Sequence, residues 1–374
     1  MLVSLDTNPS INAYDNSEIC LKMVDKSEIN DVLMDNISNR IYYELDPAGD
    51  VTLLVVNVPQ DLPPNLNELK LDVLAGRWPP ANTSDSSQGS EQNPLYIRAS
   101  SKHLALACGY FHRMFGSGFS EGMELQSKGF VELKINHPNG LAFLLLMLIV
   151  HCQPRLVSRK LSKQTLTDVA VLVDYYQCHA AVDVFADMWI KAIEKEKVYE
   201  LKGGESLKWV MISWVFRYEP KFKEATKEVV GRWKNTINAR GLPIPTVVLD
   251  MMNTQRTSFL QAFINSLHQL HTQVYRGCLL GARSNTNKNE LCTYVVLGAY
   301  TKAMMDKNVL MPKTQAPFEG IQVSRLIKDL RKSMASPRID DKGTHDKCGL
   351  FARGTAMLRL HRLPEGFDFA AVRI

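Results

Sequence analysis

The segment from Leu95 to Ile135 constrains the fold of this chain more than any other. It opens with a strand-like run at Leu95, passes through an amphipathic stretch and a short Gly-containing exit, and reaches a second strand-like run, FVELKI. The apolar positions of the amphipathic stretch repeat at helical spacing, and they are Leu104, Cys108, Phe111, Met114 and Phe115. This packing face favours a protein that binds other proteins over one that transforms a substrate.

Composition places the chain among ordinary globular proteins. Its 374 residues are 45% hydrophobic and 22% charged, which is typical of a soluble protein with two or three domains. The N-terminal residues lack the basic start and apolar run of a signal peptide. The longest apolar run, Leu141 to Val150, is too short to cross a bilayer and predicts a buried helix. We therefore expect no membrane partner.

The seven cysteines are odd in number and lack paired spacing. This usage favours free thiols in a reducing compartment. The sequence accordingly predicts a cytoplasmic or nuclear protein.

The net charge of +5 is concentrated near the C-terminus. Residues 321–374 hold 11 Lys/Arg and 6 Asp/Glu, whereas the preceding 320 residues hold 33 of each. A basic region can contact nucleic acid or acidic proteins. Because carboxylates are interspersed here, and no zinc-finger, basic-zipper or RNA-recognition signature accompanies them, we favour a solvated helical surface.

The pattern of the first half predicts alternating strands and helices. We expect residues 1–26 to be disordered, a short helix from Glu28 to Ile41, a turn at Asp46–Asp50 and a strand at Val51–Val56. Residues near 60–93 are rich in Pro and Ser and predict a disordered insertion. Beyond FVELKI, His137-Pro138 should open the helix that carries the apolar run. Two more helices are expected at Leu166–His179 and Ala180–Ile193.

The second half predicts helices only. A one-sided apolar face marks residues 204–216, and further helices are expected at 291–307 and 321–334. Residues 245–275 form one long helix or two, because the polar run 253–258 interrupts the apolar spacing.

Several phrases carry a family resemblance: SSKHLALACGYFHRMF, FSEG, FVELKI and LVDYYQCHAAVDVFADMWI. With the order strand, long loop, strand, helix, strand and a run of helices, the chain resembles the BTB/POZ domain, in particular fungal BTB-domain proteins with their DPxGDV start and VDxYQC helix. The resemblance implies an α+β fold in which a small mixed sheet is capped by a cluster of helices. It divides the chain into a disordered or swapped segment (1–42), a BTB/POZ domain (43–195), a helical domain (200–340) and a basic, partly helical tail (341–374).

The resemblance also implies a function. BTB/POZ domains are non-enzymatic interaction modules, often homodimers, in which an N-terminal segment can exchange between subunits. Some bind a cullin scaffold through a hydrophobic-x-acidic motif, which here corresponds to Phe119, Ser120 and Glu121. Alternatively, Phe119 folds back onto its own domain. Three functions stay open: an oligomerising scaffold, a substrate adaptor of a cullin-based ubiquitin ligase, and a chromatin- or DNA-associated regulator.

Candidates for chemistry are few. The set Cys278, Cys292, His345 and Cys348 has the ligand types of a structural zinc site, but it contains no CxxC pair, so we favour separate buried thiols and a surface histidine. His268 and His271 are spaced for a shared metal or for a solvated pair. Cys178-His179 could form a thiolate–imidazole pair, but adjacent helical residues do not face each other, so we favour a buried thiol beside a surface imidazole. The nucleotide-binding motif GxGxxG and the metalloprotease motif HExxH do not occur, and no GxSxG nucleophile elbow follows a predicted strand. We therefore expect no enzyme and no cofactor.

Overall fold

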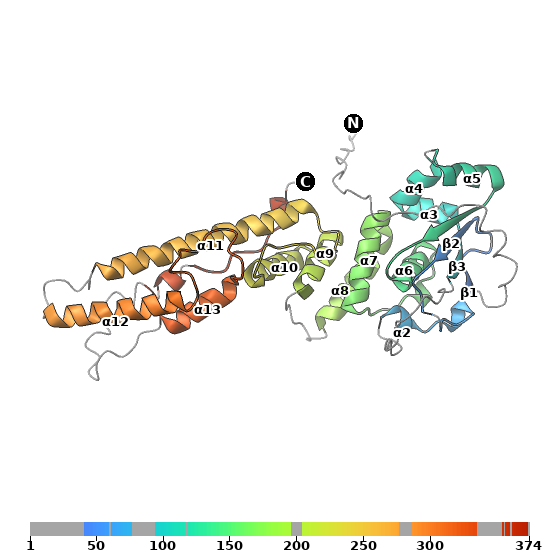
Figure 1. Ribbon diagram of the computed structural model, residues 1–374. Helices are drawn as coiled ribbons and strands as arrows, with labels where there is room; N and C mark the ends of the chain where they lie inside the picture. The colour runs from blue at the N-terminus through green and yellow to red at the C-terminus, as the bar shows by residue number, and fades with distance from the viewer. Residues whose placement is uncertain are drawn as a thin grey trace, which may run out of the picture. The chain divides into compact units, whose positions relative to one another are not determined.

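The computed structural model describes residues 41–59, 61–76, 94–116, 118–195, 204–276, 286–334, 354, 356–359 and 361–372, without the side chains of residues 286–289 and 292. The chain forms two compact units, one extending to Tyr199 and the other from Glu200 to Arg373. The architecture is α+β, with one mixed sheet in the first unit and helices throughout the second (Figure 1). Among the described helices, none combines the length and apolar character needed to span a membrane.

The sheet of the first unit has four strands in the order β1-β3-β2-β4. They are β1 (Ile41–Glu44), β2 (Val51–Val55), β3 (Leu95–Ala99) and β4 (Val131–Ile135). Strand β2 runs antiparallel to β3 and parallel to β4, while β1 runs parallel to β3. Leu53 lies opposite Ile97 on one side and Leu133 on the other, so alternate residues of the three strands bury the same face.

The predicted turn at Asp46–Asp50 is present and ends in a helix cap. The Asp46 carboxylate accepts a hydrogen bond from the Ala48 backbone at 2.9 Å, and the Gly49 N–H donates to the Asp46 carbonyl. Asp50 then accepts from both the backbone N–H and the hydroxyl of Ser101, at 2.7 and 2.6 Å. Its carboxylate therefore satisfies the first turn of the helix that follows β3.

The helices of the first unit pack around this sheet (Figure 1). They are α2 (Leu71–Leu74), α3 (Ser101–Ala107), α4 (Gly109–Gly116), α5 (Ser120–Lys128), α6 (Gly140–Val150), α7 (Lys163–Tyr176) and α8 (His179–Lys195), with short 3-10 turns at Leu66–Glu68 and Pro154–Leu156. Helix α6 carries the apolar run and is buried on all sides, as predicted. In α7, the apolar residues that repeat at helical spacing are buried too, and they are Val169, Leu172, Val173 and Tyr176.

Two expectations for the Leu95–Ile135 segment are wrong. The amphipathic stretch is two helices, because Cys108 adopts an extended conformation (φ −126°, ψ 114°) between α3 and α4. The exit before β4 is a third helix, α5, which ends at Gly129 in a left-handed conformation (φ 76°). Helical spacing continues across Cys108, so the pattern does not reveal the break.

Other expectations differ at their boundaries. Helix α6 begins two residues after Pro138, with Asn139 accepting from the Ala142 N–H at 3.1 Å. Residues 61–76 fall in the expected disordered insertion, yet they contain α2, because Leu62, Leu69 and Leu74 are buried. Residues 60 and 77–93 lie outside the described part of the chain. So do residues 1–40, including most of the expected helix, and its last residue, Ile41, begins β1.

The described residues of the second unit form five long helices. They are α9 (Gly204–Val215), α10 (Glu219–Arg232), α11 (Thr246–Tyr275), α12 (Thr286–Met305) and α13 (Val323–Ser333), and a 3-10 turn follows at Phe369–Ala371. Helices α11 and α12 lie lengthwise side by side and α13 packs against α12 (Figure 1). Helix α9 is buried nearly all round rather than on one side. In the region expected to be a partly helical tail, residues 356–359 are helical and residues 361–368 have no regular secondary structure.

The single helix α11 resolves the alternative that the polar run 253–258 left open. Asn253 both accepts from the Ile237 N–H (2.8 Å) and donates to the Ile237 carbonyl (2.9 Å). Arg256 is 1% exposed and donates to backbone carbonyls of two loops. These polar residues face the interior, where they bind backbone, so they do not interrupt the helix.

Candidate partner-binding site

The three residues of the hydrophobic-x-acidic motif lie at the start of α5. Phe119 is the N-cap residue, with extended backbone (φ −65°, ψ 155°), and its side chain is 56% exposed. Ser120 and Glu121 form the first turn, where the Ser120 hydroxyl donates to the Glu121 carboxylate at 2.9 Å. The Phe119 ring therefore does not fold back into the core.

Helix α5 is held in place by a close approach to the end of α4. Gly122 is buried, and a Cβ at this position would lie 2.8 Å from the Met114 carbonyl oxygen and 2.9 Å from that of Phe115. Real Cβ atoms do not approach a backbone oxygen so closely, so α5 can sit here only because residue 122 is glycine. This contact sets the position from which Phe119 projects.

A second exposed apolar residue extends the site. Met123 is 56% exposed, and its N–H donates to the Phe119 carbonyl at 3.0 Å. The two side chains are four residues apart and therefore neighbour each other on the helix surface. The sequence reasoning missed Met123, because the spacing gains meaning only once α5 is known to be a helix. Phe130, 60% exposed, flanks the other end of α5.

The charge of Glu121 acts on the neighbouring helix α4, where Arg113 opposes it. Burial is the main cause that raises the pKa of Tyr110, followed by its hydrogen bond with Tyr175, and the charge of Glu121 adds to the increase. The Glu121 carboxylate therefore lies within electrostatic range of the α4 surface. An exposed aromatic ring beside a carboxylate can bind a partner through apolar burial and accept its hydrogen bonds, and aromatic anchors are common in interface hot spots.

The candidates for metal or thiol chemistry are not brought together among the described residues. His268 Nε2 bonds the Val309 carbonyl, whereas His271 Nε2 bonds the Thr301 hydroxyl, each at 2.8 Å, so the two rings have separate partners. No described group of His, Cys, Asp or Glu is arranged to hold a metal ion. The zinc set cannot be placed, because Cys278, His345, Cys348 and the side chain of Cys292 lie outside the described residues.

Cys178 is a buried thiol, as one reading of the sequence held. A hydrogen bond with the Cys108 side chain, together with burial, raises the pKa of the Cys178 thiol far above its usual value. The adjacent His179 is about half exposed and lies 4.0 Å from the Asp174 carboxylate rather than on the thiol. A protonated thiol of this kind is a poor nucleophile.

Comparison with protein-family models, with curated proteins and with solved structures finds no match to this chain.

Proposed function

We propose that this chain is an interaction protein built on a BTB/POZ-type domain, and that Phe119, Ser120 and Glu121 contact a protein partner. The observation that carries the proposal is the exposure of Phe119, held outward at the start of α5 by the Gly122 contact. The element order of the first unit also supports it: β2, a long connection, β3, helices, β4 and further helices. The free thiols among the described cysteines, Cys108, Cys152 and Cys178, support a reducing compartment such as the cytoplasm or nucleus.

A cullin N-terminal region is the partner that the motif favours, which makes a ubiquitin-ligase adaptor the first form of this function to test. The purified full chain is titrated with that region by calorimetry, beside the variants Phe119→Ala and Glu121→Lys. Truncating an aromatic hot spot costs about 2 kcal/mol, so we expect roughly thirtyfold weaker binding for Phe119→Ala.

Phe130→Ala is the matched control, because it removes an equally exposed phenylalanine outside the motif. Its affinity should equal that of the wild type. A wild-type chain that does not bind the cullin region would refute the adaptor function. Equal loss in Phe119→Ala and Phe130→Ala would refute the assignment of the motif.

Self-association is the second form of the function, a homodimeric scaffold. Strand β1 is at the edge of the sheet, and its Tyr42 is 47% exposed. An edge strand presents unpaired backbone groups that another chain can pair with. We expect light scattering to give the mass of a dimer for the full chain and a lower mass after removal of residues 1–40. A monomeric full chain would contradict the scaffold.

A further inference from the structure

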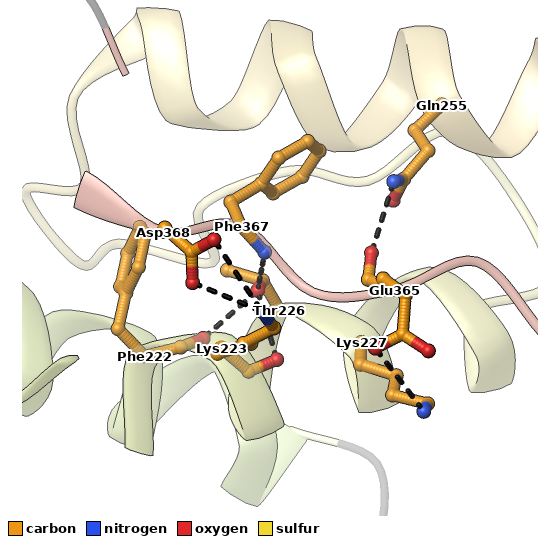
Figure 2. Close-up of polar contacts among 8 residues, drawn as sticks. All are labelled: Phe222, Lys223, Thr226, Lys227, Gln255, Glu365, Phe367 and Asp368. Atoms are coloured by element: carbon orange, nitrogen blue, oxygen red, sulfur yellow. Dashed lines mark hydrogen bonds and ion pairs between the residues drawn. The ribbon is translucent and has the colours of Figure 1, made fainter. Parts of the chain in front are cut away.

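In the second unit, residues 361–372 lie along α10 and α11 without forming a helix until Phe369 (Figure 2). We call residues 365–369, EGFDF, the docked segment. Its contacts follow a regular order: moving forward along the segment, the partners move backward along α10. The segment is therefore aligned antiparallel to the helix.

Charge pairs mark both ends of this alignment. The Glu365 carboxylate lies 3.9 Å from Lys227 Nζ, and the Asp368 carboxylate lies 3.1 Å from Lys223 Nζ. The two lysines are four residues apart and so share one face of α10. A segment with two carboxylates three residues apart matches that face in both charge and spacing.

Backbone contacts lie between the charge pairs. Thr226 Oγ1 accepts from the Phe367 N–H at 3.0 Å while it donates to the Phe222 carbonyl at 2.8 Å (Figure 2). On the other side, the Gln255 amide of α11 donates to the Glu365 carbonyl at 3.0 Å. These bonds define the position of the segment backbone between two helices.

Gly366 makes the closest approach. A Cβ at this position would lie 1.6 Å from the Lys223 carbonyl oxygen, which belongs to the helix backbone and cannot move aside. Any residue other than glycine would therefore lift the segment from α10. At residue 366, the surface of α10 therefore requires glycine, in addition to the charges that its lysines require at residues 365 and 368.

An aromatic contact completes the alignment. The Phe369 ring stacks on Phe222 with centroids 4.7 Å apart, and its centroid is 6.0 Å from that of Trp214. The Arg217 guanidinium lies 5.0 Å from the Trp214 centroid and 5.7 Å from that of Phe369. An aromatic ring, a cation and two lysines together form a surface suited to an acidic segment with aromatic residues.

The docked segment leaves part of this surface unused. Gln255 Oε1 is buried and has no hydrogen-bond partner among the described residues. A groove continues beside Phe367 along α11, lined by Val247, Asp250, Met251 and Thr254. Both charge pairs are substantially exposed to solvent, so each contributes little to holding the segment. A segment of the same pattern in another chain would meet the same lysines, hydroxyl and aromatic rings.

We propose that this surface of α10, defined by Phe222, Lys223, Thr226 and Lys227, is a recognition site for a short acidic segment of the pattern Glu-Gly-Phe-Asp-Phe in a partner protein. The chain's own residues 365–369 occupy it in the structure. The site is independent of the Phe119 motif and of the BTB/POZ assignment, since its contacts all lie within the second unit.

The test uses the full chain with Gly366→Ala, which disables its own segment without altering the α10 surface. A fluorescent peptide with the sequence of residues 361–372 is titrated by anisotropy. We expect it to bind this variant at least tenfold more tightly than it binds the wild-type chain, where the tethered segment competes at high effective concentration. The same peptide with alanine in place of Gly366 is the matched control and should bind at least tenfold more weakly.

A charge exchange tests the register. Lys223→Glu, added to the Gly366→Ala chain, should weaken peptide binding about fivefold, which corresponds to ~1 kcal/mol for an exposed ion pair. A peptide with Asp368→Lys should recover it. Equal binding of the glycine and alanine peptides, or no binding to a folded Gly366→Ala chain, would overturn the proposal. If that chain does not fold, Asp368→Ala/Phe369→Ala replaces it in the same titration, with the same two outcomes.

Discussion

The guanidinium of Arg256 lies 2.8 Å from the carbonyl oxygen of Phe318, whose backbone is left-handed (φ 58°) and whose ring is fully buried. The same guanidinium also donates to the carbonyls of Trp233, Lys234, Pro317 and Ile321. One side chain of α11 thus fixes two loops, before α11 and before α13. The left-handed backbone at Phe318 helps to point the carbonyls of Pro317 and Phe318 at the Arg256 guanidinium.

Arg256→Met should strongly destabilise the second unit. Methionine retains apolar volume but leaves several buried carbonyls without a donor, and losing one partner of a buried charged network costs about 3 kcal/mol. Chemical denaturation followed by tryptophan fluorescence would measure the change. Arg232→Met is the control, because Arg232 pairs with Glu228 on the surface and should cost less than about 1 kcal/mol. Equal effects of the two substitutions would contradict this role of Arg256.

Asp50→Ala should destabilise the first unit by about 1–2 kcal/mol, because α3 loses the carboxylate that binds the N–H and hydroxyl of Ser101. Asp50→Asn retains one acceptor and should cost less. Thermal unfolding measures both variants, with Asp61→Ala as a control at an exposed aspartate. An Asp50→Ala chain as stable as the control would show that this cap contributes nothing.

His151 should make stability depend on pH. Its Nε2 accepts from the Ser100 N–H at 3.0 Å and its Nδ1 bonds the Met147 carbonyl at 2.9 Å, an arrangement that needs the neutral ring. Burial lowers the pKa of His151 from its usual 6.5. The unfolded chain therefore binds more protons than the folded chain below pH 6.5, so the free energy of unfolding should fall with pH from that point and level off below the lowered pKa.

The measurement for His151 is urea unfolding between pH 8 and pH 4.5. In the neutral variant His151→Gln, the slope of the free energy of unfolding against pH should decrease by the contribution of one proton, at most about 1.4 kcal/mol per pH unit. Burial also lowers the pKa of His137 and of His271. Part of the pH dependence should therefore remain in the His151→Gln variant. An unchanged slope in His151→Gln would contradict the prediction.

Gly122→Ala should displace α5 and weaken partner binding through the Phe119 motif. The added Cβ meets the carbonyls of Met114 and Phe115, and overpacking of this kind costs about 1–3 kcal/mol. Gly116→Ala is the matched control, because a Cβ there meets nothing within 4 Å. Thermal unfolding should separate the two variants. Identical melting temperatures would show that the α4–α5 contact is not tight.

Much of the secondary structure follows from local pattern. Strand β2 has the β-branched run of a buried strand, and α6 has an apolar run of helical length. The inward face of α7 follows from residues that repeat with a period near 3.6. Helix α5 was missed, because its sequence is polar apart from Met123 and Leu125 and its exposed side carries no repeat.

For the candidate site too, the sequence indicates some features and only the tertiary structure shows the others. The sequence alone indicated Phe119, Ser120 and Glu121 through a family motif, but it left open whether the Phe119 ring is exposed. Exposure depends on how α5 packs against α4, and that packing depends on Gly122. Met123 joins the site for the same reason.

By itself, then, the sequence determined most strands and helices, because burial of one face imposes a local period on the residues. The α+β class and the position of the motif were indicated by the family resemblance. Only the tertiary structure decided that Arg256 is a buried centre for two loops, and that Glu365 and Asp368 of a basic region face lysines of α10. These contacts join residues separated by 22 to 145 positions. No local spacing records such pairs, since they arise only when the chain has packed.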